Sequence, residues 1–255
     1  MRRFGLLLLA GLLGACTAPN LSSSTQTGQT DLKRRTDIRL ELATAYFTSG
    51  QAEIALQELD RALELSPRRA DVLGMRGLVL MQVGEIEAAG QSLRDALRIE
   101  PQNPALQNNM GWFLCQRGEF DKAMAHFEQA LSTRSYASPE KALVNAGLCR
   151  MRQGQGAQAE AFLRRALEIE PMNLQAHAGL AQLAYDSADF TRARRHLLRV
   201  IESEQAVAEN FLMAVLVERK RGDAASEQSL LAQWRRRFPE SPQLTAYLRG
   251  ETDDK

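Results

Sequence analysis

Between Asn108 and Leu131, apolar and small residues recur every three or four positions on both sides of Gly118. This spacing is typical of two short amphipathic helices joined by a tight turn. Gly111 leaves room for a neighbouring helix to approach, and Gly118 can adopt the left-handed conformation that ends a helix. Because a single hairpin of this kind cannot bury its own apolar face, further copies are expected on either side.

Prolines that follow the second helix measure the length of the repeat. Pro67 and Pro101 are 34 residues apart, and Pro171 and Pro239 are 68 apart. The 70 residues from Pro101 to Pro171 correspond to two units and a two-residue insertion near Pro139. The resulting units are 36–69, 70–103, 104–137, 140–173, 174–207 and 208–241.

The same residue types return at fixed offsets in these units. The close-contact position of the first helix holds Ala43, Gly77, Gly111, Gly147, Ala181 and Val215. The turn holds Gly50, Gly84, Gly118, Gly154, Ala188 and Gly222. The second helix carries Ala55, Ala89, Ala123, Ala159, Ala193 and, in the last unit, Glu227. Four residues later come Leu59, Leu93, Phe127, Leu163, Leu197 and Leu231. A 34-residue period with this pattern resembles the tetratricopeptide repeat.

We therefore expect an all-α, right-handed superhelix of six tetratricopeptide-type repeats with a C-terminal capping helix, together spanning 36–249. Ser241 is expected to cap that last helix, with Pro242 at its first position. Unit five has Ala188 and Gln205 in place of the turn glycine and the closing proline. Unit six is degenerate and is expected to be a capping unit. Residues 250–255 are expected to form a disordered tail.

The composition is that of an ordinary globular protein. Apolar residues make up 44% and charged residues 25%, and the formal net charge is +1. Abundant Ala, Leu, Glu, Arg and Gln and only eight prolines favour helix over strand. Since the bulk charge is so small, nothing points to nucleic acid as a partner.

The N-terminus has the parts of a secretory signal in residues 1–15. Arg2 and Arg3 precede an apolar run, Phe4–Leu13, that is too short for a resident membrane helix. The following tetrapeptide, ending in Cys16, resembles the bacterial lipobox, which implies that Cys16 becomes acylated. The residue after the cysteine is Thr17. By the sorting rule that the resemblance brings with it, this residue implies that the lipoprotein is exported to the periplasmic face of the outer membrane. The alternative is an ordinary secretory signal with an incidental cysteine.

The stretch that follows the cysteine is expected to be a flexible tether. Thr17–Thr30 is rich in Ser, Thr, Gln and Gly, carries no charge, and has one large apolar residue, Leu21. Such a segment buries too little surface to offset the entropy of ordering. We expect the acylated cysteine and tether to occupy 16–35, with folded sequence beginning near Asp31.

First helices line the concave side of a repeat superhelix, so the register predicts a groove in units one to three. Its expected lining is Leu40, Thr44, Phe47, Gly74, Leu78, Met81, Asn108, Trp112 and Cys115, with Asp37 and Asp71 at the rim. One interpretation is that neighbouring helices and the tether cover these residues. The other is a groove for an extended or helical segment of another protein, which Trp112 favours because an exposed aromatic is costly. No inner-face position assigned to these units is Lys or Arg, which argues against capture of a carboxylate or phosphate.

The later units are more basic. The inner face of these units is assigned Lys141, Arg152, Arg219 and Lys220. The second helix of unit five carries Arg192, Arg194, Arg195 and Arg199, and another cluster is Arg235–Arg237. Glutamates at 202, 204 and 209 favour a solvated surface with local ion pairs. Contact with anionic lipid or an acidic protein is the alternative.

Catalytic and metal-binding patterns are missing from the sequence. His126, His177 and His196 fall on different helices without metal-ligand spacing and are interpreted as structural or surface residues. We expect no enzyme activity, no small-molecule substrate and no cofactor other than the lipid on Cys16. Cys115 and Cys149 are interpreted as free buried thiols, although an oxidising compartment permits a disulfide.

The amino-acid sequence of unit three shows a more specific resemblance. NNMGWFLCQRGEFDKA (residues 108–123) is similar to the pattern NN-x-G-x-F-L-C-x-x-G-x-[FY]-x-x-A of the type IV pilus biogenesis and stability lipoproteins. SYASPEKALVNAGLC (135–149) also matches. The resemblance implies a pilotin, which binds secretin subunits of the type IV pilus system and promotes their multimerisation in the outer membrane. Another lipid-anchored adaptor, for peptidoglycan hydrolases or outer-membrane protein assembly, is the alternative.

Overall fold

The chain folds into helices throughout the part that the computed structural model describes, residues 22–251, where no β-strand occurs. The helices are α1 (Ser22–Thr48), α2 (Ala52–Leu65), α3 (Ala70–Gln82), α4 (Ile86–Ile99), α5 (Pro104–Gln116), α6 (Phe120–Ser132), α7 (Pro139–Arg152), α8 (Gly156–Ile169), α9 (Leu174–Asp186), α10 (Phe190–Ile201), α11 (Ala208–Arg221), α12 (Ala224–Arg237) and α13 (Pro242–Leu248). The all-α prediction is confirmed.

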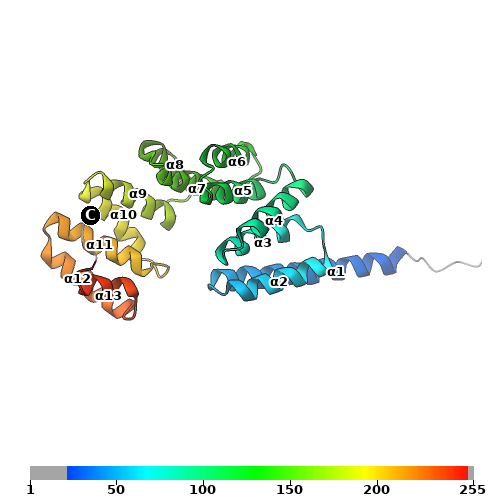
Figure 1. The fold of residues 1–255 in the computed structure, drawn as a ribbon, viewed down its shortest axis with the longest axis horizontal. Coiled ribbons are helices and arrows are strands. Elements are labelled where there is room, and N and C mark those ends of the chain that lie inside the picture. Colours follow the sequence, from blue (N-terminus) through cyan, green and yellow to red (C-terminus); the bar gives the residue numbers. More distant parts are fainter. Residues whose placement is uncertain (1–21, 252–255) are drawn as a thin grey trace, which may run out of the picture.

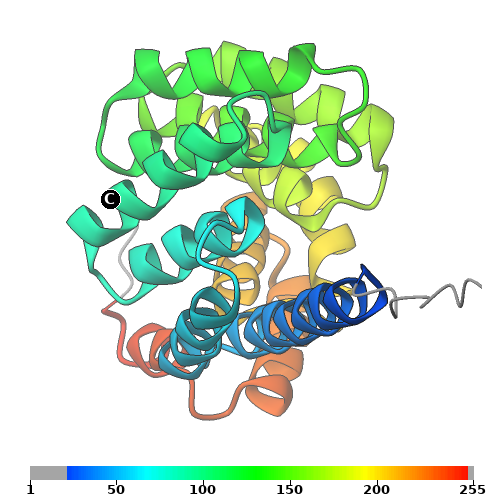
Figure 2. The ribbon, with the colours of Figure 1, turned by 90° about the vertical axis from the view of Figure 1, so that its right-hand side faces the viewer.

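Consecutive helices pack as pairs, from α1 with α2 to α11 with α12, and each pair contacts the next. From α1 to α9, first helices also contact one another across neighbouring pairs. The stack curves into an arc that has α1 and α2 at one end and α11–α13 at the other (Figure 1). Seen from the side, it winds as a superhelix (Figure 2).

The recurring small positions form the inside of each pair. The second-helix alanines Ala55, Ala89, Ala123, Ala159 and Ala193 are all 0% exposed. At Gly111 an added Cβ would lie 2.7 Å from the ring of Phe127, four residues after Ala123. The glycine therefore lets α5 and α6 approach as expected, and burial of a side chain as large as Phe127 stabilises the pair by about 3 kcal/mol.

The helix ends follow the local sequence. The turn residues Gly50, Gly84, Gly118, Gly154 and Gly222 all have positive φ. The Ser241 hydroxyl accepts a hydrogen bond from the Leu244 amide, and Pro242 begins α13, as expected. α13 packs against α11, and Trp234 of α12 is 0% exposed beneath this end of the stack. Of the predicted tail, residues 252–255 lie outside the described part.

The boundary near Asp31 differs from the structure, because α1 already begins at Ser22. Ser22–Thr30, predicted as tether, is thus helical. The physical reason is cooperativity: once the later turns of α1 pack on α2, each further residue adds a hydrogen bond without a new nucleation cost. Residues 1–21, including Cys16 and the start of the tether, lie outside the described part.

Candidate partner-binding surface

The inner face of α1 is open. A hollow of about 770 Å³ is lined by Leu40, Glu41, Thr44, Ala45, Thr48 and Ser49. Thr44 is exposed and Leu40 is half-buried. Leu40 and Ala45 form the apolar part of this lining and can accept an apolar side chain of a partner segment, and the other four residues are polar.

Aromatic and aliphatic groups continue along the next first helices. Phe47 is half-buried against the core of α1–α3, and Leu78 of α3 is half-buried as well. Met81 of α3 and Trp112 of α5 are half-buried against one shared cluster of α3–α7. Each of these four residues keeps part of its surface accessible while its remainder packs on the superhelix.

Three predicted groove residues are instead interior: Gly74, Asn108 and Cys115. Gly74 is buried against Leu106. Asn108 is only 7% exposed, and its Oδ1 accepts a hydrogen bond of 3.0 Å from Nδ2 of Asn145 on α7. Cys115 is 0% exposed. The reason is that both side chains face α7, so they hold neighbouring units together and cannot line an open groove.

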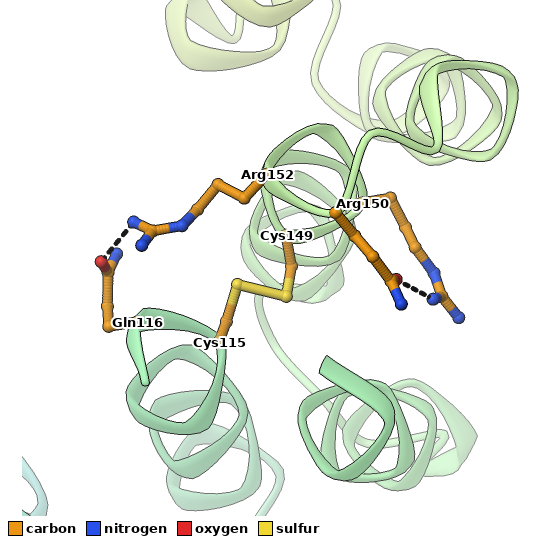
Figure 3. The surroundings of a disulfide bond; sticks show 6 residues. Cys115, Gln116, Cys149, Arg150 and Arg152 are labelled. Carbon is orange, nitrogen blue, oxygen red and sulfur yellow. Dashed lines mark hydrogen bonds between the residues drawn. A yellow bond between two sulfur atoms is a disulfide. The ribbon is translucent and has the colours of Figure 1, made fainter. Parts of the chain in front are cut away.

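Cys115 and Cys149 form a disulfide between α5 and α7, with their Cα atoms 5.7 Å apart (Figure 3). The prediction of free thiols was wrong. The first helices α5 and α7 pack directly on each other, and both cysteines lie on the facing sides with no exposed surface. Beside the disulfide, Arg152 donates a hydrogen bond of 2.5 Å to the Gln116 side chain.

The rim contains a cation that sequence reasoning missed. Arg69, just before α3, pairs with Asp37 at 2.9 Å and with Asp71 at 2.5 Å. Burial alone would raise the pKa of Asp71, but hydrogen bonding and attraction to Arg69 outweigh it and leave the pKa below its ordinary value. The two carboxylates predicted at the rim are therefore bridged, and the only sequence signal was Arg69 two positions before Asp71.

The histidines are more connected than the sequence suggested. His177 and His196, interpreted as structural or surface residues on different helices, lie with their Nδ1 atoms 2.9 Å apart. Nδ1 of His126 lies 2.5 Å from the Gln107 side-chain oxygen, and burial lowers the pKa of His126. Among the described residues no group of three or more His, Cys, Asp or Glu side chains is placed to hold a metal ion.

Several basic residues of the later units are paired, with partners other than the expected Glu202, Glu204 and Glu209. Arg192 pairs with Glu160 at 3.0 Å, and Arg194 pairs with Glu218 at 2.7 Å. Arg237 donates to the backbone oxygens of Ile201 and Ser203. These contacts join neighbouring helices, which is a structural role.

One further property bears on the membrane. Within residues 22–251, no helix combines the length and apolar character needed to cross a bilayer.

Comparison with known proteins identifies the class. One tetratricopeptide-repeat family model matches residues 40–104 and 110–173, and a second matches 80–135 and 150–214. The chain belongs to the tetratricopeptide-repeat family, whose fold serves protein–protein interaction. No curated protein matches the sequence.

Solved structures narrow the similarity further. The chain is similar to PilW, described as a widely conserved type IV pilus biogenesis factor, with 28% identity over 84% of this chain and 98% of that one (TM-score 0.70). It shares the fold of PilF from Pseudomonas aeruginosa, with 22% identity over 86% and 99% of the two chains (TM-score 0.67). A tetratricopeptide-repeat protein from Parabacteroides merdae also shares the fold, with 18% identity over 86% and 85% (TM-score 0.58).

Proposed function

We propose that this chain is a pilotin of type IV pilus biogenesis: an outer-membrane lipoprotein scaffold that binds secretin subunits and promotes their outer-membrane localisation and multimerisation. The similarity to PilW supports the pilus assignment because it extends over 84% of this chain and 98% of that chain. In this proposal the chain acts by binding alone, so it is not an enzyme.

The observation that carries the binding step is the open inner face of α1. Leu40 and Thr44 line a hollow of about 770 Å³, and Phe47, Leu78, Met81 and Trp112 continue accessible apolar surface onto α3 and α5. A segment of the secretin with spaced apolar side chains would bury this surface, and the aromatic anchors would supply much of the affinity.

Lipid on Cys16 supplies the second half of the mechanism. Acyl chains bind the bilayer through buried methylene groups, each contributing about 0.8 kcal/mol. The lipoprotein sorting route would carry the anchored chain, with its bound secretin, to the periplasmic face of the outer membrane. Replacing Cys16 with Ser should abolish incorporation of radiolabelled palmitate and leave secretin outside the outer-membrane fraction. Normal palmitate labelling of Cys16→Ser would contradict the anchor.

The binding step is tested by co-purification of the secretin with the full-length chain. Thr44→Glu places a charge in the hollow without disturbing the core, because Thr44 is exposed. We expect the secretin to be lost with Thr44→Glu, Phe47→Ala or Trp112→Ala, and retained with the control Gln57→Glu on the exposed side of α2. Secretin multimers that still form in the outer membrane of a deletion strain would refute the pilotin role.

The alternative is another lipid-anchored repeat adaptor of the bacterial envelope, for peptidoglycan hydrolases or outer-membrane protein assembly. A deletion strain that keeps twitching motility but changes cell shape would favour it.

A further inference from the structure

A second hollow lies on the other side of α5 from Trp112. Its volume is about 530 Å³, and Arg94, Leu97 and Arg98 of α4, Phe113 of α5, and Arg117 and Lys122 near the start of α6 are among its lining residues. Of the α5 residues that contribute to it, Met110 and Leu114 lie on the opposite side of the helix from Trp112, and Phe113 lies about 100° around the helix from it. A partner in this hollow would leave the inner face free.

The rim of this hollow, which we call the α4–α6 hollow, carries more cations than carboxylates. Arg98 pairs with Asp95 at 2.7 Å, and Glu119 accepts from both Arg117 at 2.9 Å and Lys122 at 2.7 Å. Arg94 is exposed and donates a hydrogen bond of 3.0 Å to the Gln91 side chain. Four cationic side chains thus share two carboxylates.

The floor of the α4–α6 hollow is apolar. Phe113 is 3% exposed, Met110 6% and Leu114 9%. Gly90, in the interior of α4, faces Phe113: a Cβ there would lie 2.7 Å from the ring. An interior helical glycine costs about 1 kcal/mol relative to alanine, so its presence is explained by this approach.

The repeat supplies its own comparison. The equivalent positions lie in units five and six, three 34-residue units and the two-residue insertion further along the chain. There a hollow of only about 10 Å³ is lined by Leu198, Ile201, Ala214, Val217, Glu218 and Leu230. There Arg194 stands in the place of Gly90, and its guanidinium is bonded to Glu218 at 2.7 Å. Beside this small hollow, another of about 420 Å³ is lined by Thr191, Arg194, Arg195, Leu198, Arg199, Glu202 and Arg221, none of which is aromatic. The α4–α6 hollow is therefore distinguished from its counterpart in the later units by Phe113.

We propose that the α4–α6 hollow docks an acidic segment of a partner polypeptide. The segment places one large apolar side chain over Phe113, between α4 and α6, and directs its carboxylates to Arg94, Arg98 and Lys122. The volume suits a side-chain anchor with its flanking backbone. The excess of cations fits carboxylates, with which arginine forms two parallel hydrogen bonds. The recessed floor favours an inserted side chain over a flat lipid surface. This proposal is independent of the pilotin role.

A binding measurement with a designed probe tests the proposal. The probe is a short fluorescent peptide with a central Leu-Phe pair flanked by glutamates, titrated with the full-length chain. The double variant Arg94→Glu, Lys122→Glu changes two exposed side chains and should weaken binding about tenfold or more, since two charge pairs are removed and each reversed charge adds repulsion. Raising the salt concentration should also weaken binding.

Controls separate this site from general charge attraction. Arg235→Glu with Arg236→Glu makes the same charge change at exposed positions of α12 and should alter the affinity less than twofold. A peptide with lysines in place of glutamates should not bind, and one with alanines in place of Leu-Phe should bind at least about tenfold more weakly. The proposal is overturned if the acidic peptide does not bind or if both double variants weaken it equally. It is also overturned if vesicles containing phosphatidylglycerol bind at these residues and the peptide does not.

Discussion

At the residue scale, one pair of positions distinguishes alternate units. A first-helix residue meets the residue 19 positions later on the second helix. In units one, three and five the pairs are polar: Arg39–Glu58, Gln107–His126 and His177–His196. In units four and six the same positions hold Leu143–Phe162 and Phe211–Leu230. Since a buried polar group is costly unless it is bonded, the polar pairs favour one specific packing of each helix pair.

The hydrogen bonds of the histidine pair define its protonation. Nε2 of His177 lies 3.1 Å from the backbone oxygen of Pro171, which can only accept, so this nitrogen carries the proton. Nδ1 of a neutral His177 is then an acceptor, and Nδ1 of His196 donates to it. Burial lowers the pKa of His196 to about 4, followed by the positive charge of His177 in its protonated form and by the charges of Arg195, Arg192 and Arg164.

This pair predicts a pH dependence of stability. The folded pKa of His196 lies below the roughly 6.5 of an unfolded histidine, so the unfolded chain binds more protons in between. The contribution of His196 is therefore full above about pH 6.5 and is lost as the pH falls towards 4. The free energy of unfolding in urea should fall between pH 7.5 and pH 4.5 in both proteins. We expect this fall to be about 1–3 kcal/mol smaller in His196→Gln than in the parent chain. An identical difference in both proteins would contradict the assignment.

At the element scale, the hairpin turns differ in one position. Five turns use glycine at positive φ, but unit five places Ala188 there, with φ of 58°. An L-residue in the left-handed region costs about 1–2 kcal/mol, because its Cβ approaches the following carbonyl oxygen. The left-handed conformation of Ala188 is therefore imposed by the packing of α9 and α10 on each other and is not favoured by the local sequence.

Ala188→Gly should therefore stabilise the protein by about 0.5–1 kcal/mol, the relief of strain less the added entropy of the unfolded chain. Gly154→Ala, in the equivalent turn of unit four with φ of 77°, should destabilise it by about 1 kcal/mol. Urea unfolding of the two variants measures both effects. A stability change of the same sign in the two would show that the turn conformation is not the cause.

The disulfide between α5 and α7 also acts at this scale. It closes a 34-residue separation, for which the loss of chain entropy in the unfolded state predicts about 3–4 kcal/mol of stabilisation. Reduction, or replacement of both Cys115 and Cys149 by Ala, should lower the free energy of unfolding by this amount. The double-alanine variant is the control for the reductant, to which it should be insensitive. An oxidised parent protein no more stable than its reduced form would refute the prediction.

At the scale of the whole molecule, the two ends of the stack are unequal. Trp234 and Leu230 are buried at the C-terminal end, where Tyr247 of α13 packs on the Trp234 ring at 5.8 Å between centroids. At the other end, Ile38 and Leu42 of α1 are 46% and 40% exposed. Only the C-terminal end is thus closed by an additional helix within the described part of the chain.

Removal of α13 should expose this closed end. Truncation after Glu240 is expected to lower the melting temperature and to promote self-association, because Trp234 loses its cover. The point variant Leu244→Ala should destabilise by about 2–3 kcal/mol, since Leu244 is 3% exposed. Circular dichroism and sedimentation velocity measure the two effects. A truncated chain that melts like the parent and stays monomeric would contradict the capping role.

The sequence by itself determined the helices, their pairing and the repeat, because periodicity and small residues at fixed offsets are local properties. It placed Leu40 and Trp112 on the inner side for the same reason. Only the tertiary structure decided which of those positions stay accessible: Asn108 and Cys115 turn towards α7, whose approach the helical period does not encode. The disulfide, the His177–His196 pair and the bridge made by Arg69 likewise depend on helices meeting in space. The approach of Gly90 to Phe113, at the floor of the α4–α6 hollow, joins two units and is a juxtaposition that no single repeat contains.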